Sequence, residues 1–363
     1  MSSPPPTLFI PGPTPVPEHI LQAMAQPVIG HRTPEFSRLW EEITQGLEQL
    51  LGAEKVFLFS NPATALWEAA VRNSVQKRAL NLVNGAFGSR WHTVTQACGL
   101  PCDLLERPWG AAIHPEDVDG ALASNKYDTV TLVHNETSTG VANPLEDIAE
   151  LIQAKYPDII LHVDAVSSMA ATELRVTQWG LGSCFASVQK AWGLPPGYSI
   201  CAVSGAALER SSRMAGKGYY LDYLVYDKYY RKSQNVATPS IAHMYGLAAV
   251  LKDIAAEGAE ARYARHREMA ATTRAWALDH GQSLYAAAGY ESVTLTAIRN
   301  DQSWDMQALY EALEGAGYRM DRGYGKLRGE VFRIAHMGAV TPADLRSYLA
   351  AFDEALKGLG VPA

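Results

Sequence analysis

Residues 56–203 alternate between two hydrophobic patterns. Short apolar runs rich in Val, Ile, Leu and Phe are typical of buried strands, whereas apolar residues that recur every three or four positions are typical of amphipathic helices. The runs predict strands at 56–60, 80–83, 102–105, 129–134, 159–164, 184–188 and 199–203. The periodic segments predict helices at 63–77, 87–98, 115–124 and 145–155.

This alternation predicts an α/β fold whose large domain holds a mostly parallel seven-stranded sheet sandwiched by helices. The last two strands are close in sequence, so we expect them to form an antiparallel or tightly connected pair. Upstream, helices are predicted at 17–24 and 34–51, with Thr33 as the N-cap of the second. The segment 219–234 is too aromatic and charged for a core helix, and we interpret it as an irregular surface or subunit-contact segment.

A long helical region, 240–280, follows and contains a polar stretch near Glu257 and Gly258. Beyond it, the pattern predicts strands at 292–298 and 330–335 and helices at 306–316 and 342–356. We therefore expect a large domain at 15–257 and a smaller C-terminal α/β domain at 258–363. The proline-rich residues 1–14 are interpreted as an extended arm near the functional site, where Gly12 can bring the backbone close to a ligand.

Composition narrows the functional classes. The 363 residues are 47% hydrophobic, which is enough for a substantial core. Lys and Arg number 31 against 38 Asp and Glu, so the net charge of −7 argues against nucleic acid or an anionic membrane as the main partner. The start has no signal-peptide pattern and no apolar run approaches a membrane span, so we expect a cytoplasmic protein. The four cysteines have no metal-binding spacing, and no metal is expected.

Two predicted strands end on residues with acid–base chemistry. Asp164 ends I-I-L-H-V-D, and Gln189 and Lys190 follow C-F-A-S-V. In an open α/β sheet, ligands bind at the carboxyl ends of the strands. A lysine can form an imine with a carbonyl cofactor, and an aspartate can keep a ring nitrogen protonated, which is the arrangement that pyridoxal phosphate requires. Taken alone, such a pair is more often a strand-end carboxylate and a solvated lysine.

Other groups are expected at the same edge of the sheet. The backbone N–H groups of 60–64 and the Thr64 hydroxyl could hold a phosphate at a helix N-terminus, although an ordinary helix cap is the alternative. Phe87 follows a strand and could stack on a planar cofactor or simply belong to the core. Thr137 lies in the polar loop H-N-E-T-S-T-G. Arg333 lies between apolar residues, where a substrate carboxylate or a structural salt bridge could neutralise it.

The chain resembles the class V aminotransferases of the fold-type I pyridoxal phosphate enzymes. The motifs that carry the resemblance occur in the family's order and cover almost the whole chain: P-G-P-T-P-V-P, G-H-R-T-P-E-F, H-N-E-T-S-T-G-V, H-V-D-A-V-S-S, S-V-Q-K-A-W, A-T-P-S-I and F-R-I-A-H-M-G. The resemblance implies an enzyme that binds pyridoxal 5′-phosphate and works as a homodimer with shared active sites.

The resemblance also implies residue roles. Lys190 would form the Schiff base with the cofactor and then move a proton between the substrate and the cofactor, and Asp164 would face the pyridinium nitrogen. Phe87 would stack on the ring and Thr137 would bind its phenolic oxygen. The remaining implied contacts are Ala63, Thr64, Gln189 and, across a dimer interface, Thr238 for the phosphate, and Arg333 for the substrate carboxylate. Two positions depart from the family pattern: Pro62-Ala63, where Gly or Ser is usual, and 235–237, where a Tyr or Asn is usual.

Two substrate classes fit the resemblance. Serine–pyruvate and alanine–glyoxylate aminotransferases take small neutral amino acids and 2-oxo acids, whereas phosphoserine aminotransferases bind a phosphate with an early His-Arg pair. His31 and Arg32 form such a pair, for which a dimer-interface salt bridge is the alternative. Residue 327, however, is Leu within the basic stretch that precedes Arg333. We therefore favour serine or alanine as the donor, with phosphoserine as the alternative; a cofactor-binding protein without activity is disfavoured by the intact motifs.

Overall fold

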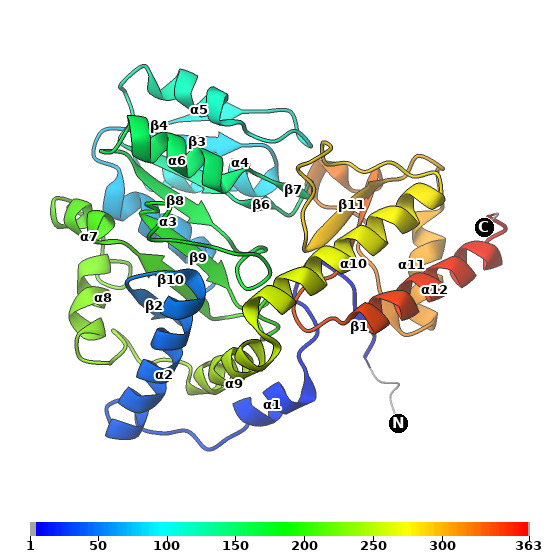
Figure 1. The fold of residues 1–363 in the computed structure, drawn as a ribbon, viewed down its shortest axis with the longest axis horizontal. Helices are drawn as coiled ribbons and strands as arrows, with labels where there is room; N and C mark the ends of the chain where they lie inside the picture. Colours follow the sequence, from blue (N-terminus) through cyan, green and yellow to red (C-terminus); the bar gives the residue numbers. More distant parts are fainter. Residues whose placement is uncertain (1–4, 362–363) are drawn as a thin grey trace.

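A seven-stranded sheet forms the centre of the computed structural model, which describes residues 5–361 (Figure 1). The first four residues of the arm expected at 1–14 thus lie outside the described residues. The strands follow the order β2-β10-β9-β8-β5-β3-β4. Only β10 runs antiparallel to its neighbours, β2 and β9. Their bounds are β2 Val56–Phe59, β3 Ala79–Val83, β4 Cys102–Glu106, β5 Thr129–Val133, β8 Ile160–Asp164, β9 Ser183–Ser187 and β10 Ser199–Val203. The predicted sheet, including its antiparallel end, is confirmed.

Helices cover both faces of this sheet because successive strand residues point to opposite sides. In β2, Val56 and Leu58 join one hydrophobic cluster, whereas Phe57 and Phe59 join another. The first cluster includes residues of α2 (Pro34–Leu51), α5 (Pro115–Leu122), α6 (Leu145–Lys155) and α9 (Ile241–Glu257). The second includes residues of α3 (Thr64–Ser74), α4 (Ala86–Ala97), α7 (Gly205–Ser212) and α8 (Tyr223–Tyr230).

Helix α8 corrects the prediction of an irregular segment at 219–234. The Asp222 side chain accepts a hydrogen bond from the Leu224 backbone N–H and so caps the helix. Tyr223 and Tyr226 are buried, and the Tyr226 ring stacks on Phe59 at a centroid distance of 3.9 Å. The prediction was wrong because these tyrosines serve as core residues, and their rings bury as much apolar surface as other aromatic side chains.

The C-terminal residues build a third hydrophobic cluster, the C-terminal cluster. Helices α9 and α10 (Ala259–Asp279) are separated at Gly258, whose φ of 83° breaks the helical path. Strands β11 (Leu295–Arg299) and β13 (Val331–Ala335) pair antiparallel, and α11 (Met306–Gly315) and α12 (Pro342–Gly358) pack beside them. The domain bounds themselves stay a prediction.

Residues 7–9 pack against this C-terminal cluster rather than against the large sheet. Strand β1 (Thr7–Leu8) pairs in parallel with β12 (Tyr318–Arg319). The Phe9 ring is fully buried and stacks on Tyr348 at 4.1 Å. The remaining short elements are α1 (Glu18–Met24), β6 (Asn135–Glu136), β7 (Val141–Ala142) and the 3-10 helix η1 (Gly325–Leu327).

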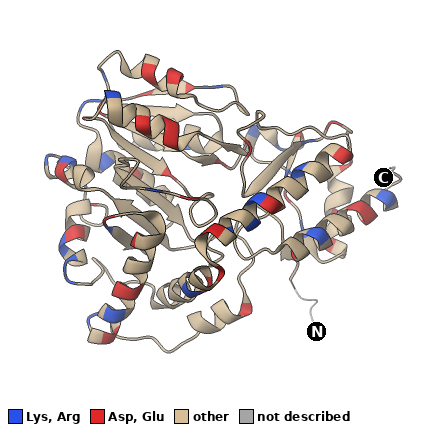
Figure 2. Cartoon of the chain, viewed as in Figure 1, with Lys and Arg blue, Asp and Glu red and all other residues tan. Residues whose placement is uncertain are grey.

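Charged side chains gather on the outer helices and are scarce on the central sheet (Figure 2). Within the described seven-stranded sheet, acidic side chains occur only on the edge strand β4 and at Asp164 of β8, so Asp164 is the one buried carboxylate at a strand end of this sheet. Within residues 5–361, no helix combines the length and apolarity that crossing a membrane requires. The same residues contain no group of three His, Cys, Asp or Glu side chains arranged to hold a metal ion, and the four cysteines are free.

Candidate active site

A cavity of about 220 Å³ opens where β2, β5, β8 and β9 end. The structure brings together seven residues that the sequence predicted to bind the cofactor, namely Ala63, Thr64, Phe87, Thr137, Asp164, Gln189 and Lys190. The cavity is also lined by Pro62, Trp67, Arg90, Val133, Asn135 and Val166. Residues from five separate chain segments thus meet at one edge of the sheet, as expected for an open α/β fold.

Asp164 is the last residue of β8 and is buried at the inner wall of the cavity. Its carboxylate accepts hydrogen bonds from Trp67 Nε1 at 2.7 Å and from the Val166 backbone N–H at 2.8 Å. Burial raises the pKa of Asp164 to about 6, although both hydrogen bonds act in the opposite direction. A carboxylate held this way would gain stability from a cation beside it, such as a protonated ring nitrogen.

Lys190 lies close to the N-terminal arm. Its Nζ donates a hydrogen bond to the Pro11 carbonyl, and Thr14 Oγ1 donates to the Lys190 carbonyl at 2.9 Å. Gly12 has a φ of 93°, and a Cβ at this position would lie 2.6 Å from Lys190 Cδ, so only glycine fits there. Burial, followed by the charge of Arg333, lowers the pKa of Lys190 to about 8. The amine therefore reaches its neutral, nucleophilic form at a lower pH than an exposed lysine.

Glu136 was not among the predicted site residues, yet it holds two walls of the cavity together. One carboxylate oxygen accepts from the backbone N–H groups of Phe87 and Gly88, both at 3.0 Å, and the other accepts from the Ser138 backbone N–H at 3.1 Å. Glu136 is fully buried, and burial raises its pKa. A Cβ at Gly85 would lie 2.3 Å from Glu136 Cγ, so the glycine makes room for this carboxylate.

The N-terminus of α3 is suited to a phosphate. The backbone N–H groups of Ala63 and Thr64 donate no hydrogen bond to any other described residue, and they lie at the positive end of the helix. Gln189 lines the same cavity, and its side-chain NH2 group offers donors for a phosphate, while its side-chain oxygen is buried without a partner in the described chain. Together with the Asp164 carboxylate and the reactive amine of Lys190, these groups fit pyridoxal phosphate.

Arg333 does not line the cavity, but it contacts a residue that does. Its Nη1 donates to the Thr137 carbonyl at 2.8 Å, while Nε and Nη2 donate to the Asp321 carboxylate at 2.7 and 2.8 Å. The structural salt bridge considered for Arg333 is thus present. Substrate binding by Arg333 stays a prediction, and Asp321 was missed because nothing in the sequence pairs positions 321 and 333.

Besides Arg333 and Gly12, three further predicted site residues lie outside the cavity of this chain. The Arg32 guanidinium donates to the Gln234 side chain and to the Asn235 carbonyl, both at 3.0 Å. Thr238 is exposed, and His31 is half-buried. Their roles in binding therefore stay predictions.

Trp67, Arg90 and Tyr324 were also missed from the sequence. Tyr324 stacks on Phe87 with ring centroids 5.3 Å apart, and its hydroxyl accepts a hydrogen bond from Arg90 Nη2 at 2.5 Å. These contacts join the segment that precedes β13 to the cavity wall. Tryptophan beside a helix start and a tyrosine in a glycine-rich turn carry no sequence pattern that marks a site.

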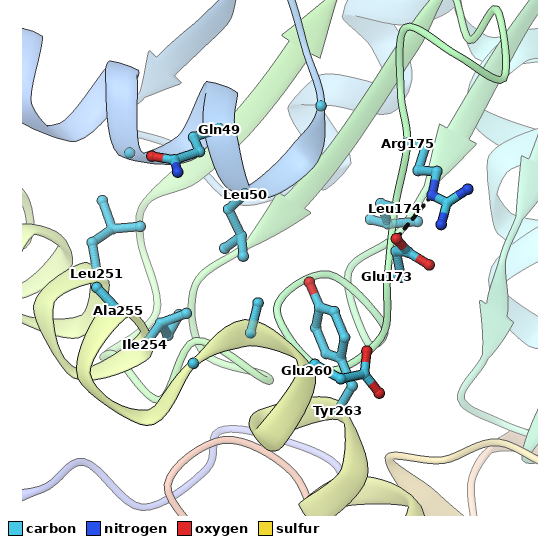
Figure 3. A pocket seen from close by; sticks show the side chains of 14 residues that line it. Gln49, Leu50, Glu173, Leu174, Arg175, Leu251, Ile254, Ala255, Glu260 and Tyr263 are labelled. Atoms are coloured by element: carbon cyan, nitrogen blue, oxygen red, sulfur yellow. Dashed lines mark hydrogen bonds and ion pairs between the residues drawn. The ribbon is translucent and has the colours of Figure 1, made fainter.

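A larger hollow of about 590 Å³ lies elsewhere, between α2, α9 and the start of α10 (Figure 3). Its charged side chains are already neutralised, because Glu173 pairs with Arg175 at 2.8 Å and Glu260 pairs with Arg267. The remaining wall is formed mainly by small and aliphatic residues. Chemistry therefore points to the smaller cavity around Lys190, despite its size.

Comparison with known proteins agrees with this geometry. The family model described as aminotransferase class-V matches residues 7–300. An uncharacterized aminotransferase of Methanocaldococcus jannaschii is 36% identical and covers 97% of this chain and 93% of that protein. The L-aspartate–glyoxylate aminotransferase of Paracoccus denitrificans is 32% identical with coverages of 98% and 92%, and the serine–glyoxylate aminotransferase of Methylorubrum extorquens is 29% identical with the same coverages.

Solved structures of the same fold extend the comparison. The alanine–glyoxylate aminotransferase of Nostoc sp. superposes with a TM-score of 0.91 at 28% identity, covering 98% of this chain and 96% of that one. A phosphoserine aminotransferase of Cytophaga hutchinsonii gives 0.87 at 25% identity, with coverages of 96% and 98%. The fold and the cavity thus define a fold-type I aminotransferase. The chain belongs to the class V aminotransferase family and is a transaminase that uses pyridoxal 5′-phosphate.

Proposed function

We propose that this transaminase moves an amino group from serine or alanine to a small 2-oxo acid, glyoxylate or pyruvate. The observation that carries the proposal is the convergence of Lys190 and Asp164 in a small cavity beneath the N-terminus of α3. Glyoxylate is favoured as the acceptor because the named relatives from Paracoccus, Methylorubrum and Nostoc all use it.

We assign the residue roles from the family resemblance, and the shared cavity supports them. When bound, pyridoxal phosphate supplies an aldehyde that accepts the amino group and a ring that takes up electrons from the substrate Cα. Lys190 would bind this aldehyde and would then carry a proton to and from the substrate, since its lowered pKa suits both directions. Asp164 would keep the ring nitrogen charged, and Phe87 and Thr137 would contact the ring. Ala63, Thr64 and Gln189 would hold the phosphate.

The substrate carboxylate is assigned to Arg333, in keeping with the family resemblance. The position of Arg32 supports a donor without a phosphate, because its guanidinium is exposed and already donates to Gln234 and Asn235. Aspartate is a second candidate donor, since Arg90 places a cation in the cavity wall and one named relative uses aspartate. Phosphoserine is the third.

We also propose a homodimer with shared active sites. Thr238 lies outside the cavity of its own chain, and a partner subunit would use it at its cofactor phosphate. His31 and Arg32 also lie outside that cavity, and we assign them to the dimer contact. The cytoplasmic location stays a prediction.

A donor panel tests the proposal. Serine, alanine, aspartate and phosphoserine are each supplied with glyoxylate, pyruvate or 3-phosphohydroxypyruvate, and kcat/KM is compared. We expect kcat/KM for serine or alanine with glyoxylate to exceed that for phosphoserine by at least about a hundredfold. A preference for phosphoserine would require several charge-assisted hydrogen bonds to its phosphate, and Arg32 already donates to Gln234 and Asn235. A preference for phosphoserine or aspartate by orders of magnitude would replace the proposed donor.

A further inference from the structure

The hydrogen bonds of Arg333 leave one part of its guanidinium unused. A guanidinium has five N–H donors. Two of them bind the Asp321 carboxylate through Nε and Nη2, and one binds the Thr137 carbonyl through Nη1. One N–H on Nη1 and one on Nη2 are therefore left without a partner among the described residues. Two donors on neighbouring nitrogens are what a carboxylate needs for bidentate binding.

Asp321 is fixed by the fold and not only by this ion pair. Its Oδ1 also accepts the Gly323 backbone N–H at 2.9 Å, and its carbonyl accepts the Arg333 backbone N–H at 3.2 Å. The turn is tight, because Gly323 has a φ of 86° and a Cβ there would lie 2.2 Å from the Val331 carbonyl oxygen. Moving the Asp321 carboxylate away from Arg333 would break all these contacts together.

We infer that Asp321 is a positioning residue that holds the Arg333 guanidinium so that its unused Nη1 and Nη2 donors receive the substrate carboxylate. The inference rests on the proposed function, in which Arg333 binds that carboxylate. The inference adds that the Asp321 carboxylate binds the guanidinium edge formed by Nε and Nη2, and that the substrate carboxylate binds the edge formed by Nη1 and Nη2. The Thr137 carbonyl accepts a hydrogen bond from Arg333 and so connects this arrangement to the cavity wall.

The opposite role for Asp321 is a plug that the substrate has to displace. A plug would need to leave easily, whereas the Asp321 side chain accepts three hydrogen bonds and its backbone is paired with Arg333. The ion pair is also largely shielded, since the Arg333 side chain is 4% exposed and that of Asp321 17%. Shielding favours retention of the pair, because a buried guanidinium without its partner is costly.

Propionate binding to the holoenzyme tests the inference. Propionate offers a carboxylate but no amino or oxo group, so its dissociation constant by titration calorimetry does not depend on which donor the enzyme uses. In Asp321→Asn we expect that constant to rise about tenfold to a hundredfold, because the guanidinium is no longer held. The KM values for donor and acceptor should rise similarly, while kcat stays within about threefold.

Matched variants make the result specific. Glu314→Gln removes the carboxylate of another arginine pair in the same part of the chain, that with Arg319, and should leave propionate binding unchanged. If Asp321→Asn unfolds more than about 5 °C below the wild type, Asp321→Ser replaces it, since a hydroxyl can still accept from Gly323 but cannot bridge the guanidinium. Equal or tighter propionate binding in the folded Asp321 variant overturns the inference, and tighter binding identifies a plug.

Arg333→Ala separates this inference from the proposed function. Unchanged propionate binding in that variant would also overturn it, because the carboxylate would then bind elsewhere. A wild type that binds propionate through Arg333 and Asp321 but fails to transaminate serine and alanine would leave the positioning role standing and contradict the proposed donor alone.

Discussion

At the scale of single residues, burial gives the site its chemistry. The pKa values of aspartate and lysine lie far apart when the side chains are exposed. Burial in this cavity moves the pKa of Asp164 up to about 6 and that of Lys190 down to about 8. The same burial requires fixed partners, and Trp67 and Val166 supply them for Asp164. Each change to these two residues should therefore affect reactivity more than folding.

Asp164→Asn should retain the cofactor and lose most of the activity. A neutral amide cannot keep the ring nitrogen protonated, and we expect a loss of about 2–4 kcal/mol of transition-state stabilisation, or roughly thirtyfold to a thousandfold in kcat. Steady-state kinetics measure the loss, and the cofactor content per chain is the control. Turnover near that of the wild type would exclude the assigned role.

Lys190 should react at lower pH than an exposed lysine. Because its folded-state pKa is lowered from 10.5 to about 8, the amine is charged below that pH and becomes neutral above it. Acetylation of the apoenzyme by trace acetic anhydride, with free phenylalanine as the internal standard, should therefore level off above about pH 9 at the Lys190 peptide. Acetylation that keeps rising to pH 11 would contradict the lowered pKa, and borohydride reduction of the holoenzyme should add the cofactor mass to the same peptide.

Single residues also mark the limit of sequence-based prediction. The meeting of Lys190, Asp164 and Thr64 at one edge of the sheet could be predicted because each ends a strand, follows one or begins a helix, and the topology brings such positions together. Asp321 could not, since its partner Arg333 is identified only by the folding of a glycine turn against β13. Glu136 lies in the motif H-N-E-T-S-T-G. Two of its hydrogen-bond donors are backbone N–H groups at the start of α4, and no pattern in the motif indicates them.

At the scale of secondary structure, local patterns predicted the elements well where period and capping agreed. Helix α2 begins at Pro34 with Thr33 as its cap, as predicted, and its buried residues lie on one face. Helix α8 was not predicted because so aromatic and charged a segment is untypical of a core helix. The rings of its tyrosines are buried only because β2 presents Phe57 and Phe59 to them, which is a tertiary effect.

Helix α4 should depend on Glu136 for its position. Glu136→Gln replaces one acceptor oxygen by an N–H₂ group, which then faces backbone donors of Phe87 and Gly88 or of Ser138. Each buried N–H left unsatisfied costs about 1–3 kcal/mol, so we expect a clear fall in the free energy of unfolding by denaturant. Asp344→Asn is the control, because it alters an exposed capping box on α12 and should cost about 1 kcal/mol or less. Equal losses in both variants would argue against a special role for Glu136.

At the scale of the whole molecule, the N-terminal arm connects parts that are far apart in sequence. Strand β1 pairs with β12, Phe9 packs on Tyr348, and Pro11 then contacts Lys190. The C-terminal cluster and Lys190 are thus joined by residues 7–11 near the start of the described chain. The family resemblance predicted an arm near the site, but its pairing with β12 needed the folded structure.

In the proposed homodimer, the segment 229–235 and Arg32 would form the surface at which a second copy of the chain completes the site. The Arg32 guanidinium lies over the Tyr229 ring at 5.3 Å and donates to Gln234 and the Asn235 carbonyl, so it stabilises the shape of this surface rather than the cavity of its own chain. Light scattering should show a homodimer. Arg32→Ala should weaken that dimer and lower activity most at low enzyme concentration, because a shared site is lost on dissociation.

The ratio of kcat/KM for serine to that for phosphoserine should stay within about twofold of the wild type in Arg32→Ala, since the change removes a dimer contact and no substrate contact. Measuring this ratio at an enzyme concentration high enough to restore the dimer separates assembly from recognition. Arg333→Ala is the matched comparison, because it should reduce kcat/KM for every amino acid alike. If phosphoserine alone were lost in Arg32→Ala, with the dimer intact, Arg32 would be reading a phosphate and the donor would have to be reassigned. An active monomer at working concentration would contradict the shared site itself.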